Sequence, residues 1–306
     1  MIPPQTDSAI TLDDGLARLV IRPDLGAGIA AYDLRVDGQF QEIFRRAPAD
    51  VGAHFDLACN VLVPWSNRIS GGGFTFDGEF FALEPNLASD PFPIHGNGFS
   101  AAWQVTRHDS NRLVLELGSE GPGPYRYDGS VEYALEQGAL NVRLQLRNRA
   151  ARALPYGMGL HPWLPRTART ELLAPAARVW LEDERHLPSG SELVAAVPGW
   201  DFSQPRTLPQ LWINNGFTGW TGAARIRWPE RHLSLDIQAS AELSTYIVYS
   251  PGQASSFLAF EPVSHPVDAF NLPGGAEANG MTVLRPGEEW TATCRFVPRQ
   301  DGQPLR

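Results

Sequence analysis

Short runs in which apolar and polar residues alternate dominate the chain. In residues 140–146 every second residue is Leu or Val, and the residues between them are Asn, Arg and Gln. Residues 131–135 alternate in the same way. A period of two places all the apolar side chains on one face of a β-strand. Gln137-Gly138 lies between the two runs, so we expect a hairpin with the glycine at the left-handed backbone position.

The same alternation recurs along the chain, while helical periodicity is weak. Further runs are residues 112–117, 224–228, 233–237, 245–249 and 256–260. The chain contains 29 Gly and 26 Pro, which separate these short runs. This punctuation is typical of a large antiparallel sandwich, so we predict an all-β fold, mostly antiparallel, with few short helices. No internal repeat, linker or charge block marks a boundary, which predicts a single domain over residues 1–306.

The composition limits the class of partner and of chemistry. A length of 306 residues suits one large β domain, and a hydrophobic fraction of 43% is ample for its core. The net charge of −9 argues against a nucleic-acid or anionic-membrane partner, since both favour a basic surface. All 25 basic residues are arginine, which excludes a Schiff-base lysine and the lysine of a phosphate-binding loop.

The low cysteine content and the lack of a visible targeting signal predict a soluble protein without a disulfide framework. Two cysteines are too few for a disulfide framework, and Cys294 falls on the apolar face of an alternating run, so we expect it in the core. Residues 1–7 lack a basic segment followed by an apolar one, which predicts no signal peptide. No apolar stretch approaches the ~20 residues of a membrane span. We therefore expect a cytoplasmic protein.

Three distant segments each hold an ionisable side chain in a frame of Pro, Gly and aromatic residues. They are residues 92–96 around His95, 159–163 around His161 and 260–266 around Glu261. Proline fixes backbone angles, so such a frame suits a side chain whose direction matters. Two histidines and a carboxylate suffice to move protons between two oxygens near neutral pH. Trp163 adds a ring of the kind that stacks on a sugar, and the set predicts a metal-free acid–base enzyme acting on a sugar.

Each of these residues also has a structural interpretation. Arg68, which follows Asn67 and precedes a glycine turn, can fork to two sugar hydroxyls or tie its loop to backbone carbonyls. A lone histidine such as His95 is more often a loop residue that bonds to the backbone than a catalyst, and Trp163 can also be simply a large core residue. Glu261 ends the apolar strand of residues 257–260 and is clamped by Pro262. A carboxylate there is costly unless it is paired or its pKa is raised, which favours a function.

The remaining histidines receive structural roles only. His265 is expected to brace its loop, and four others lie in polar surroundings and are expected to have no function: His54, His108, His186 and His232.

Two other kinds of active site fit the sequence less well. Two histidines and a glutamate can hold a catalytic zinc, but the chain lacks HExxH, CxxC or any close pair of ligands. A glycosidase needs two carboxylates, and no second carboxylate is framed as Glu261 is. We expect no metal and no cofactor.

In this order the motifs resemble the aldose 1-epimerase (galactose mutarotase) family. The resemblance extends over about residues 10–298 and implies a single-domain β-supersandwich with a shallow sugar cleft. It is carried by residues 63–69 (VPWSNRI), 73–78 (GFTFDG), 93–96 (PIHG), 159–163 (GLHPW) and 261–266 (EPVSHP).

The resemblance also implies the roles of the site residues. Glu261 corresponds to the general base that takes the proton of the anomeric hydroxyl. His161 corresponds to the general acid that protonates the ring oxygen and opens the ring. His95 would hold and polarise the ring oxygen, while Asn67 and Arg68 bind sugar hydroxyls. The implied partner is a free monosaccharide, bound by a monomer or homodimer.

One position departs from the family pattern. Asn214 stands where the family usually has an Asp that contacts sugar hydroxyls, so the absence of that charge is expected to alter affinity or sugar preference. Gln253 is the candidate for the family's substrate-binding Gln. Two alternatives stay open: a hexose-6-phosphate 1-epimerase, for which Arg68 and the Arg225/Arg227 pair are suggestive, and a non-catalytic carbohydrate-binding or regulatory module.

Overall fold

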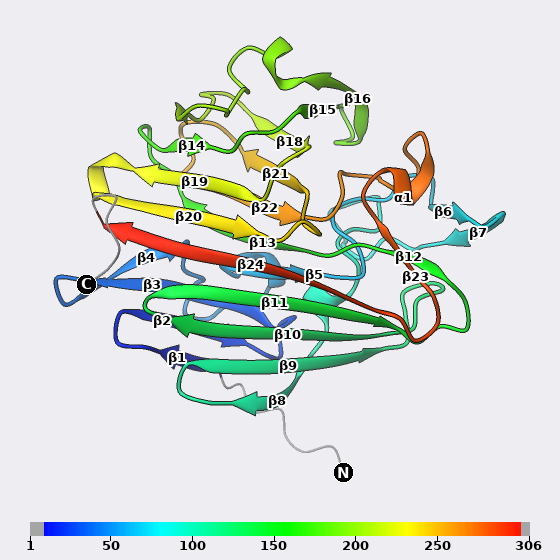
Figure 1. Ribbon diagram of the computed structural model, residues 1–306, viewed down its shortest axis with the longest axis horizontal. Coiled ribbons are helices and arrows are strands. Elements are labelled where there is room, and N and C mark those ends of the chain that lie inside the picture. The colour runs from blue at the N-terminus through cyan, green and yellow to red at the C-terminus, as the bar shows by residue number, and fades with distance from the viewer. Residues whose placement is uncertain (1–8, 301–306) are drawn as a thin grey trace.

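The computed structural model describes residues 9–300, which form two large β-sheets packed face to face (Figure 1). The eleven-stranded first sheet has the order β1-β2-β3-β5-β13-β22-β21-β18-β15-β16, with β4 beside β3. Their bounds are β1 (Ile10–Asp13), β2 (Ala17–Arg22), β3 (Gly28–Val36), β4 (Gln39–Phe44), β5 (Cys59–Leu62), β13 (Gly159–Pro165), β15 (Arg178–Glu182), β16 (Pro188–Leu193), β18 (Ile213–Thr218), β21 (Thr245–Ser250) and β22 (Phe257–Val263).

The nine-stranded second sheet has the order β17-β14-β19-β20-β24-β11-β10-β9-β8, with β24 crossing its middle (Figure 1). Its strands are β8 (Gln104–His108), β9 (Arg112–Ser119), β10 (Tyr127–Glu136), β11 (Ala139–Asn148), β14 (Glu171–Leu173), β17 (Arg206–Thr207), β19 (Ala223–Trp228), β20 (Leu233–Ala239) and β24 (Glu289–Gln300). Two small sheets pair β6 (Gly73–Phe76) with β7 (Glu79–Ala82) and β12 (Leu154–Tyr156) with β23 (Thr282–Leu284).

Helical structure is confined to short segments. The described residues contain α1 (Gly275–Ala278) and 3₁₀ turns at His54–Asp56, Gly98–Ser100, Val194–Ala196 and Pro229–Arg231. All the ladders between named strands are antiparallel. The predicted all-β, mostly antiparallel fold with few short helices is confirmed.

The core lies between the two sheets, where the apolar faces of the alternating strands meet. The predicted run in β11 buries Leu140, Leu144 and their apolar neighbours, while the residues between them are the more exposed ones. Two buried tyrosines tie the sheets together. Tyr32 of β3 donates to the carbonyl oxygen of Gly138 at 2.6 Å, and Tyr133 of β10 donates to that of Ala27 at 2.8 Å.

Several local predictions are confirmed. Gln137 and Gly138 join β10 to β11 with φ values of 53° and 78°, as a hairpin turn of this kind requires. Cys294 is buried in β24, and Cys59 is also a buried free thiol.

The predicted end of the strand at Glu261 is wrong, because β22 continues through Pro262 to Val263. Proline lacks only the amide donor and is compatible with an extended backbone, so it did not end this strand. The ladder between β13 and β22 pairs Gly159 with Val263 and residues 163–165 with 257–259, and is interrupted between these points.

No helix within residues 9–300 is long and apolar enough to cross a membrane. The N-terminal residues, for which the sequence predicts no signal peptide, lie outside the described residues.

Candidate active site

The candidate site lies on neighbouring strands in the middle of the first sheet. β13 carries His161 and Trp163, and the adjacent β22 carries Glu261. The pairing of Gly159 with Val263 and of Trp163 with Ala259 places His161 opposite Glu261 across the two strands. The register of the two strands therefore brings together two residues that are one hundred positions apart in the sequence.

His161 and Glu261 form a close and almost fully buried pair. The Nε2 atom of His161 lies 3.3 Å from Oε1 of Glu261, and the two side chains are only 8% and 3% exposed. Burial raises the pKa of the Glu261 carboxyl from 4.5 to about 8, opposed only in part by the charge of Arg68. Burial also lowers the pKa of His161 from 6.5 to about 4, and the charge of Arg45 acts in the same direction. The cost of burying charge outweighs the attraction of an ion pair, so the pair rests as a carboxylic acid beside a neutral imidazole.

Two polar atoms of this pair have no partner. Oε2 of Glu261 and Nδ1 of His161 are buried and make no hydrogen bond to any described residue. A buried polar group without a partner costs roughly 1–3 kcal/mol, so native structures keep few of them without a function. The geometry on which the acid–base hypothesis depends is therefore present for His161 and Glu261.

His95 is held in one tautomer by the loop before β6. Its Nδ1 accepts a hydrogen bond from the amide of Asn67 at 2.9 Å, and its own amide donates to the Asn67 carbonyl oxygen at 3.1 Å. Both residues have left-handed backbones, with φ of 59° for His95 and 58° for Asn67. Burial lowers the pKa of His95 well below 6.5, and the neighbouring His161 adds to this. The neutral ring must then carry its proton on Nε2, which has no partner among the described residues, and its centroid lies 5.5 Å from that of His161.

Arg68 is ordered by a carboxylate that the sequence did not reveal. Its guanidinium contacts Asp90 through Nε at 2.9 Å and Nη2 at 2.8 Å, and its amide donates to the side-chain oxygen of Asn67. Arg68 and Asn67 both line the cleft. Because Asp90 holds the edge of the guanidinium that carries Nε and Nη2, the direction in which Nη1 points is also fixed.

A cleft of about 350 Å³ contains all the predicted site residues. Phe55 and Trp163 supply apolar surface, and the rings of Trp163 and His161 lie 4.7 Å apart. Arg45, which the sequence gave no reason to single out, stacks over Trp163 at 4.9 Å. The lining residues are Arg45, Phe55, Asn67, Arg68, Leu87, Ser89, Asp90, Ile94, His95, His161, Trp163, His186, Trp212, Asn214, Tyr249 and Glu261.

Asn214 lies in the cleft, and a carboxylate stands directly behind it. Its Nδ2 donates to Oε2 of Glu182 at 2.9 Å, and the same oxygen lies 2.8 Å from Nδ1 of His186. The Nε1 atom of Trp212 donates to the other oxygen of Glu182 at 2.6 Å. The interpretation of His186 as a residue without a place in the site is therefore wrong. His186 follows the polar segment 183–185, and nothing local indicated that the register of β15 and β18 would bring it to the cleft.

The other candidates lie elsewhere. His265 braces its loop as predicted, since Nε2 accepts from the amide of Ser66 at 3.1 Å and Nδ1 bonds the carbonyl oxygen of Pro266. Arg225 and Arg227 belong to β19 of the second sheet and pair with carboxylates there, so they cannot form a phosphate site over the cleft. Gln253 is exposed and is not among the cleft residues.

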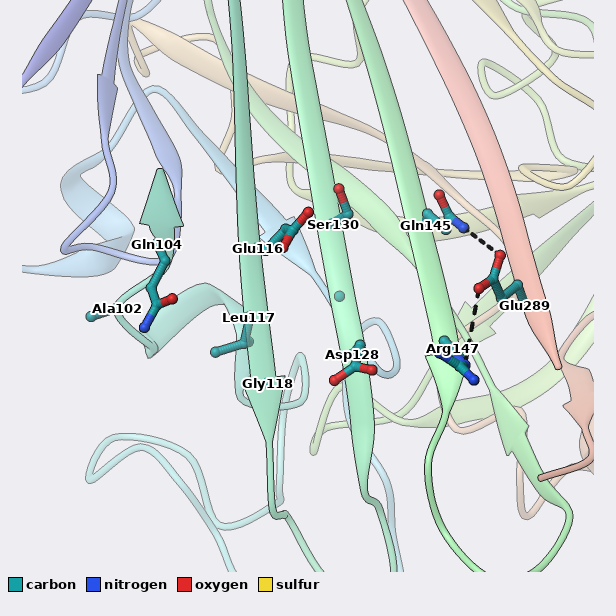
Figure 2. Close-up of a pocket in the computed structure, with 11 residues that line it drawn as sticks. Ala102, Gln104, Glu116, Leu117, Gly118, Asp128, Ser130, Gln145, Arg147 and Glu289 are labelled. Atoms are coloured by element: carbon teal, nitrogen blue, oxygen red, sulfur yellow. Dashed lines mark hydrogen bonds and ion pairs between the residues drawn. The ribbon is translucent and has the colours of Figure 1, made fainter. Parts of the chain in front are cut away.

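A second hollow, of about 590 Å³, lies on the outer face of the second sheet (Figure 2). Its lining includes polar side chains of β8 to β11 and β24, among which Gln145 donates to Glu289 at 2.7 Å. None of the sequence-predicted site residues lies there. Within residues 9–300 no group of three or more His, Cys, Asp or Glu side chains is arranged to hold a metal ion.

Solved structures with this two-sheet architecture are galactose mutarotase-like proteins. A galactose mutarotase-like protein from Clostridium acetobutylicum superimposes with a TM-score of 0.82 and covers 95% of both chains at 17% identity, which shows the shared fold. A putative aldose 1-epimerase from Escherichia coli K12 superimposes with a TM-score of 0.87 at 30% identity, covering 96% of this chain and 99% of its own.

The sequence comparison gives the family. Residues 8–297 match the family described as Aldose 1-epimerase, and the chain belongs to that family. The uncharacterised protein YphB of Escherichia coli K12 is 34% identical over 248 residues, which are 79% of this chain and 83% of YphB. A maltose epimerase from Levilactobacillus brevis is 28% identical over 205 residues, 60% of this chain and 58% of that enzyme.

Proposed function

We propose that the protein is an aldose 1-epimerase that interconverts the α and β anomers of a free aldose without a cofactor. The observation that carries this proposal is the buried His161–Glu261 pair, whose facing atoms lie 3.3 Å apart inside a cleft. Opening a hemiacetal ring requires the loss of one proton at the anomeric hydroxyl and the gain of one at the ring oxygen. A carboxyl and an imidazole on adjacent strands supply both transfers.

The proton inventory of the pair fits this reaction. With the pKa of Glu261 near 8 and that of His161 near 4, the two groups together hold one proton between these values. An anomeric hydroxyl that donates to the unpartnered Oε2 favours the Glu261 carboxylate and so drives the proton to His161. Glu261 then takes the hydroxyl proton while His161 protonates the ring oxygen, and the C1–O5 bond breaks. After rotation about C1–C2 the ring closes on the other face, with the two roles exchanged.

The rest of the cleft positions the ring. The proton on Nε2 of His95 can be donated to the ring oxygen. Nη1 of Arg68, which donates at 3.5 Å to Oδ1 of Asn67, and the side chain of Asn67 can bind hydroxyls. Trp163 offers an apolar surface to a sugar face. Each positioned acid or base typically contributes ~10²–10⁴-fold to the rate.

Polarimetry of freshly dissolved α-glucose, α-galactose, L-arabinose and maltose tests the proposal, with the spontaneous drift subtracted. Wild-type protein should accelerate the drift for at least one sugar, and Glu261→Gln should reduce that acceleration by ~100-fold or more. Glu192→Gln, at an exposed carboxylate of β16, is the matched control. Equal acceleration by wild type and Glu261→Gln, or none by either, would refute the catalytic assignment. Tight sugar binding by calorimetry without anomer exchange would instead favour a non-catalytic carbohydrate-binding module.

Arg45 is the observation that favours a second candidate, a hexose-6-phosphate 1-epimerase. Its guanidinium is half-buried in the cleft wall, where the charges of Asp56 and Glu42 act on it without a direct ion pair to either. A partly buried cation with no carboxylate bound directly to it is suited to an anionic ligand. Under this alternative Arg45→Met raises the KM for glucose 6-phosphate far more than that for glucose. Equal effects on both sugars, or a wild-type preference for free glucose, would reject it.

A further inference from the structure

One wall of the cleft is built around a carboxylate that does not itself line the cleft. Glu182 is the last residue of β15, and the pairing of Arg178 with Thr218 and Val179 with Phe217 brings it opposite Asn214 of β18. We call Glu182, His186, Trp212 and Asn214 the Glu182 cluster. The last three line the cleft, whereas Glu182 stands behind them.

The hydrogen bonds of this cluster determine which atoms face a ligand. A carboxylate only accepts hydrogen bonds, so Glu182 must receive Nδ2 of Asn214, Nδ1–H of His186 and Nε1 of Trp212. This fixes the amide orientation of Asn214 and the tautomer of His186. The atoms left over are Oδ1 of Asn214 and Nε2 of His186, and neither has a partner among the described residues. Oδ1 of Asn214 is an acceptor, and Nε2 of His186 is an acceptor in the neutral form of the ring.

We propose that the Glu182 cluster is a hydroxyl-reading subsite, in which Glu182 is a positioning residue that makes Asn214 and His186 present two acceptors to the sugar. The proposal rests on the proposed function, because it assigns a substrate preference to the same cleft. The matching ligand edge carries two neutral hydroxyls that donate. A phosphate or carboxylate at that edge is disfavoured. Its oxygens would face the acceptor atoms of Asn214 and His186, and its negative charge would lie near that of Glu182.

The cluster also explains how Asn can stand at position 214 without loss of an acceptor. The charge expected there lies on Glu182, one hydrogen bond away, and it forces the Asn214 amide to offer its oxygen only. Transferring the negative charge from position 182 to position 214 tests this explanation. Glu182→Gln removes the group that orients Asn214, and Asn214→Asp places two carboxylates at a hydrogen-bond distance, where they repel. The double variant Glu182→Gln/Asn214→Asp keeps one charge and one hydrogen bond between the two positions.

The experiment measures anomer exchange of the preferred aldose by saturation-transfer NMR, giving KM and kcat for the four proteins. Each single variant should raise KM about tenfold, as expected for the loss of one or two hydrogen bonds, with a smaller effect on kcat. The double variant should return KM to within about threefold of wild type. A cluster that serves only stability gives no such rescue, and KM effects that multiply in the double variant, or a wild-type KM in Glu182→Gln, would overturn the proposal. Thermal melting confirms that each variant is folded.

A second pair of variants keeps the test decisive if Glu182→Gln does not fold. His186→Asn retains a donor near the Nδ1 position but removes the Nε2 acceptor, whereas His186→Gln retains an amide near the Nε2 position. KM should rise about tenfold in the first and less in the second, and equal, unaltered KM values in both would contradict the subsite. If wild type shows no anomer exchange, the proposed function fails, and the dissociation constants of the same variants for the sugar, by calorimetry, still test the subsite. Absence of sugar binding by the wild type would overturn both.

Discussion

Replacing Glu261 by Gln should stabilise the protein at alkaline pH, although it removes the proposed base. The carboxyl is only 3% exposed, and burial raises its pKa from 4.5 in the unfolded chain to about 8 in the fold. Between these values the folded state binds more protons than the unfolded state, so stability falls as pH rises. The contribution of the Glu261 carboxyl to stability is fully present below pH 4.5 and is lost once the pH exceeds about 8.

The magnitude follows from the size of the shift. At about 1.4 kcal/mol per pKa unit, the raised pKa of Glu261 lowers the free energy of unfolding of wild type by roughly 3 kcal/mol at pH 7 and roughly 5 kcal/mol at pH 9, relative to pH 4. Glu261→Gln lacks this cost at every pH. His161, whose pKa is lowered from 6.5 to about 4, contributes stability that rises with pH over that range. Above pH 6.5 this contribution is complete, so it adds no pH dependence between pH 7 and pH 9.

The assay is urea denaturation of wild type, Glu261→Gln and the exposed control Glu192→Gln at pH 5, 7 and 9. The difference in free energy of unfolding between wild type and Glu261→Gln should grow steadily with pH in favour of the variant. The curve for Glu192→Gln should run parallel to that of wild type. A constant difference between wild type and Glu261→Gln, or one that grows in favour of wild type, would refute the claim that the buried carboxyl is held protonated.

Three further predictions concern other parts of the chain. The pH profile of kcat/KM for anomer exchange should be bell-shaped, falling tenfold per unit below about pH 4 as His161 gains a proton and above about pH 8 as Glu261 loses one; a profile that stays flat to pH 10 would contradict the shared proton. Gly157→Ala should destabilise the fold by ~1–3 kcal/mol in urea titrations, because its Cβ would lie 2.3 Å from Nε2 of His265 and break the brace to Ser66. Leu144→Ala, in β11 at 2% exposure, should cost ~2–5 kcal/mol in the same assay, and a loss below 1 kcal/mol would argue against the core described above.

Local patterns predicted the strands and singled out residues that the structure brings together in one cleft. Alternation in β10 and β11 and the Gln137-Gly138 turn are local properties, so the sequence contained all that was needed to predict that hairpin. The frames around His161 and Glu261 indicated two residues that work in fixed directions. Their placement 3.3 Å apart depends on strand register, which no local pattern encodes.

The residues that the sequence did not reveal are those whose significance is entirely tertiary. Asp90 matters because it holds Arg68, and Arg45 because it lies over Trp163 in the wall of the cleft. Glu182 lies at the end of β15 in a polar segment, where the sequence alone predicts an ordinary solvated carboxylate. Only the pairing of β15 with β18 brings it next to Asn214. Pro262 misled in the other direction, because a proline usually ends a central strand and here it does not.

The order of strands in the first sheet places the proposed proton transfer and the proposed sugar recognition on different strands. The proposed proton-transfer pair lies on β13 and β22, which are flanked by strands on both sides, whereas the Glu182 cluster belongs to β15, β18 and the turn next to the edge strand β16. Replacements near a sheet margin disturb few neighbours, so we expect substitutions in the Glu182 cluster to change the proposed sugar preference without moving the central pair.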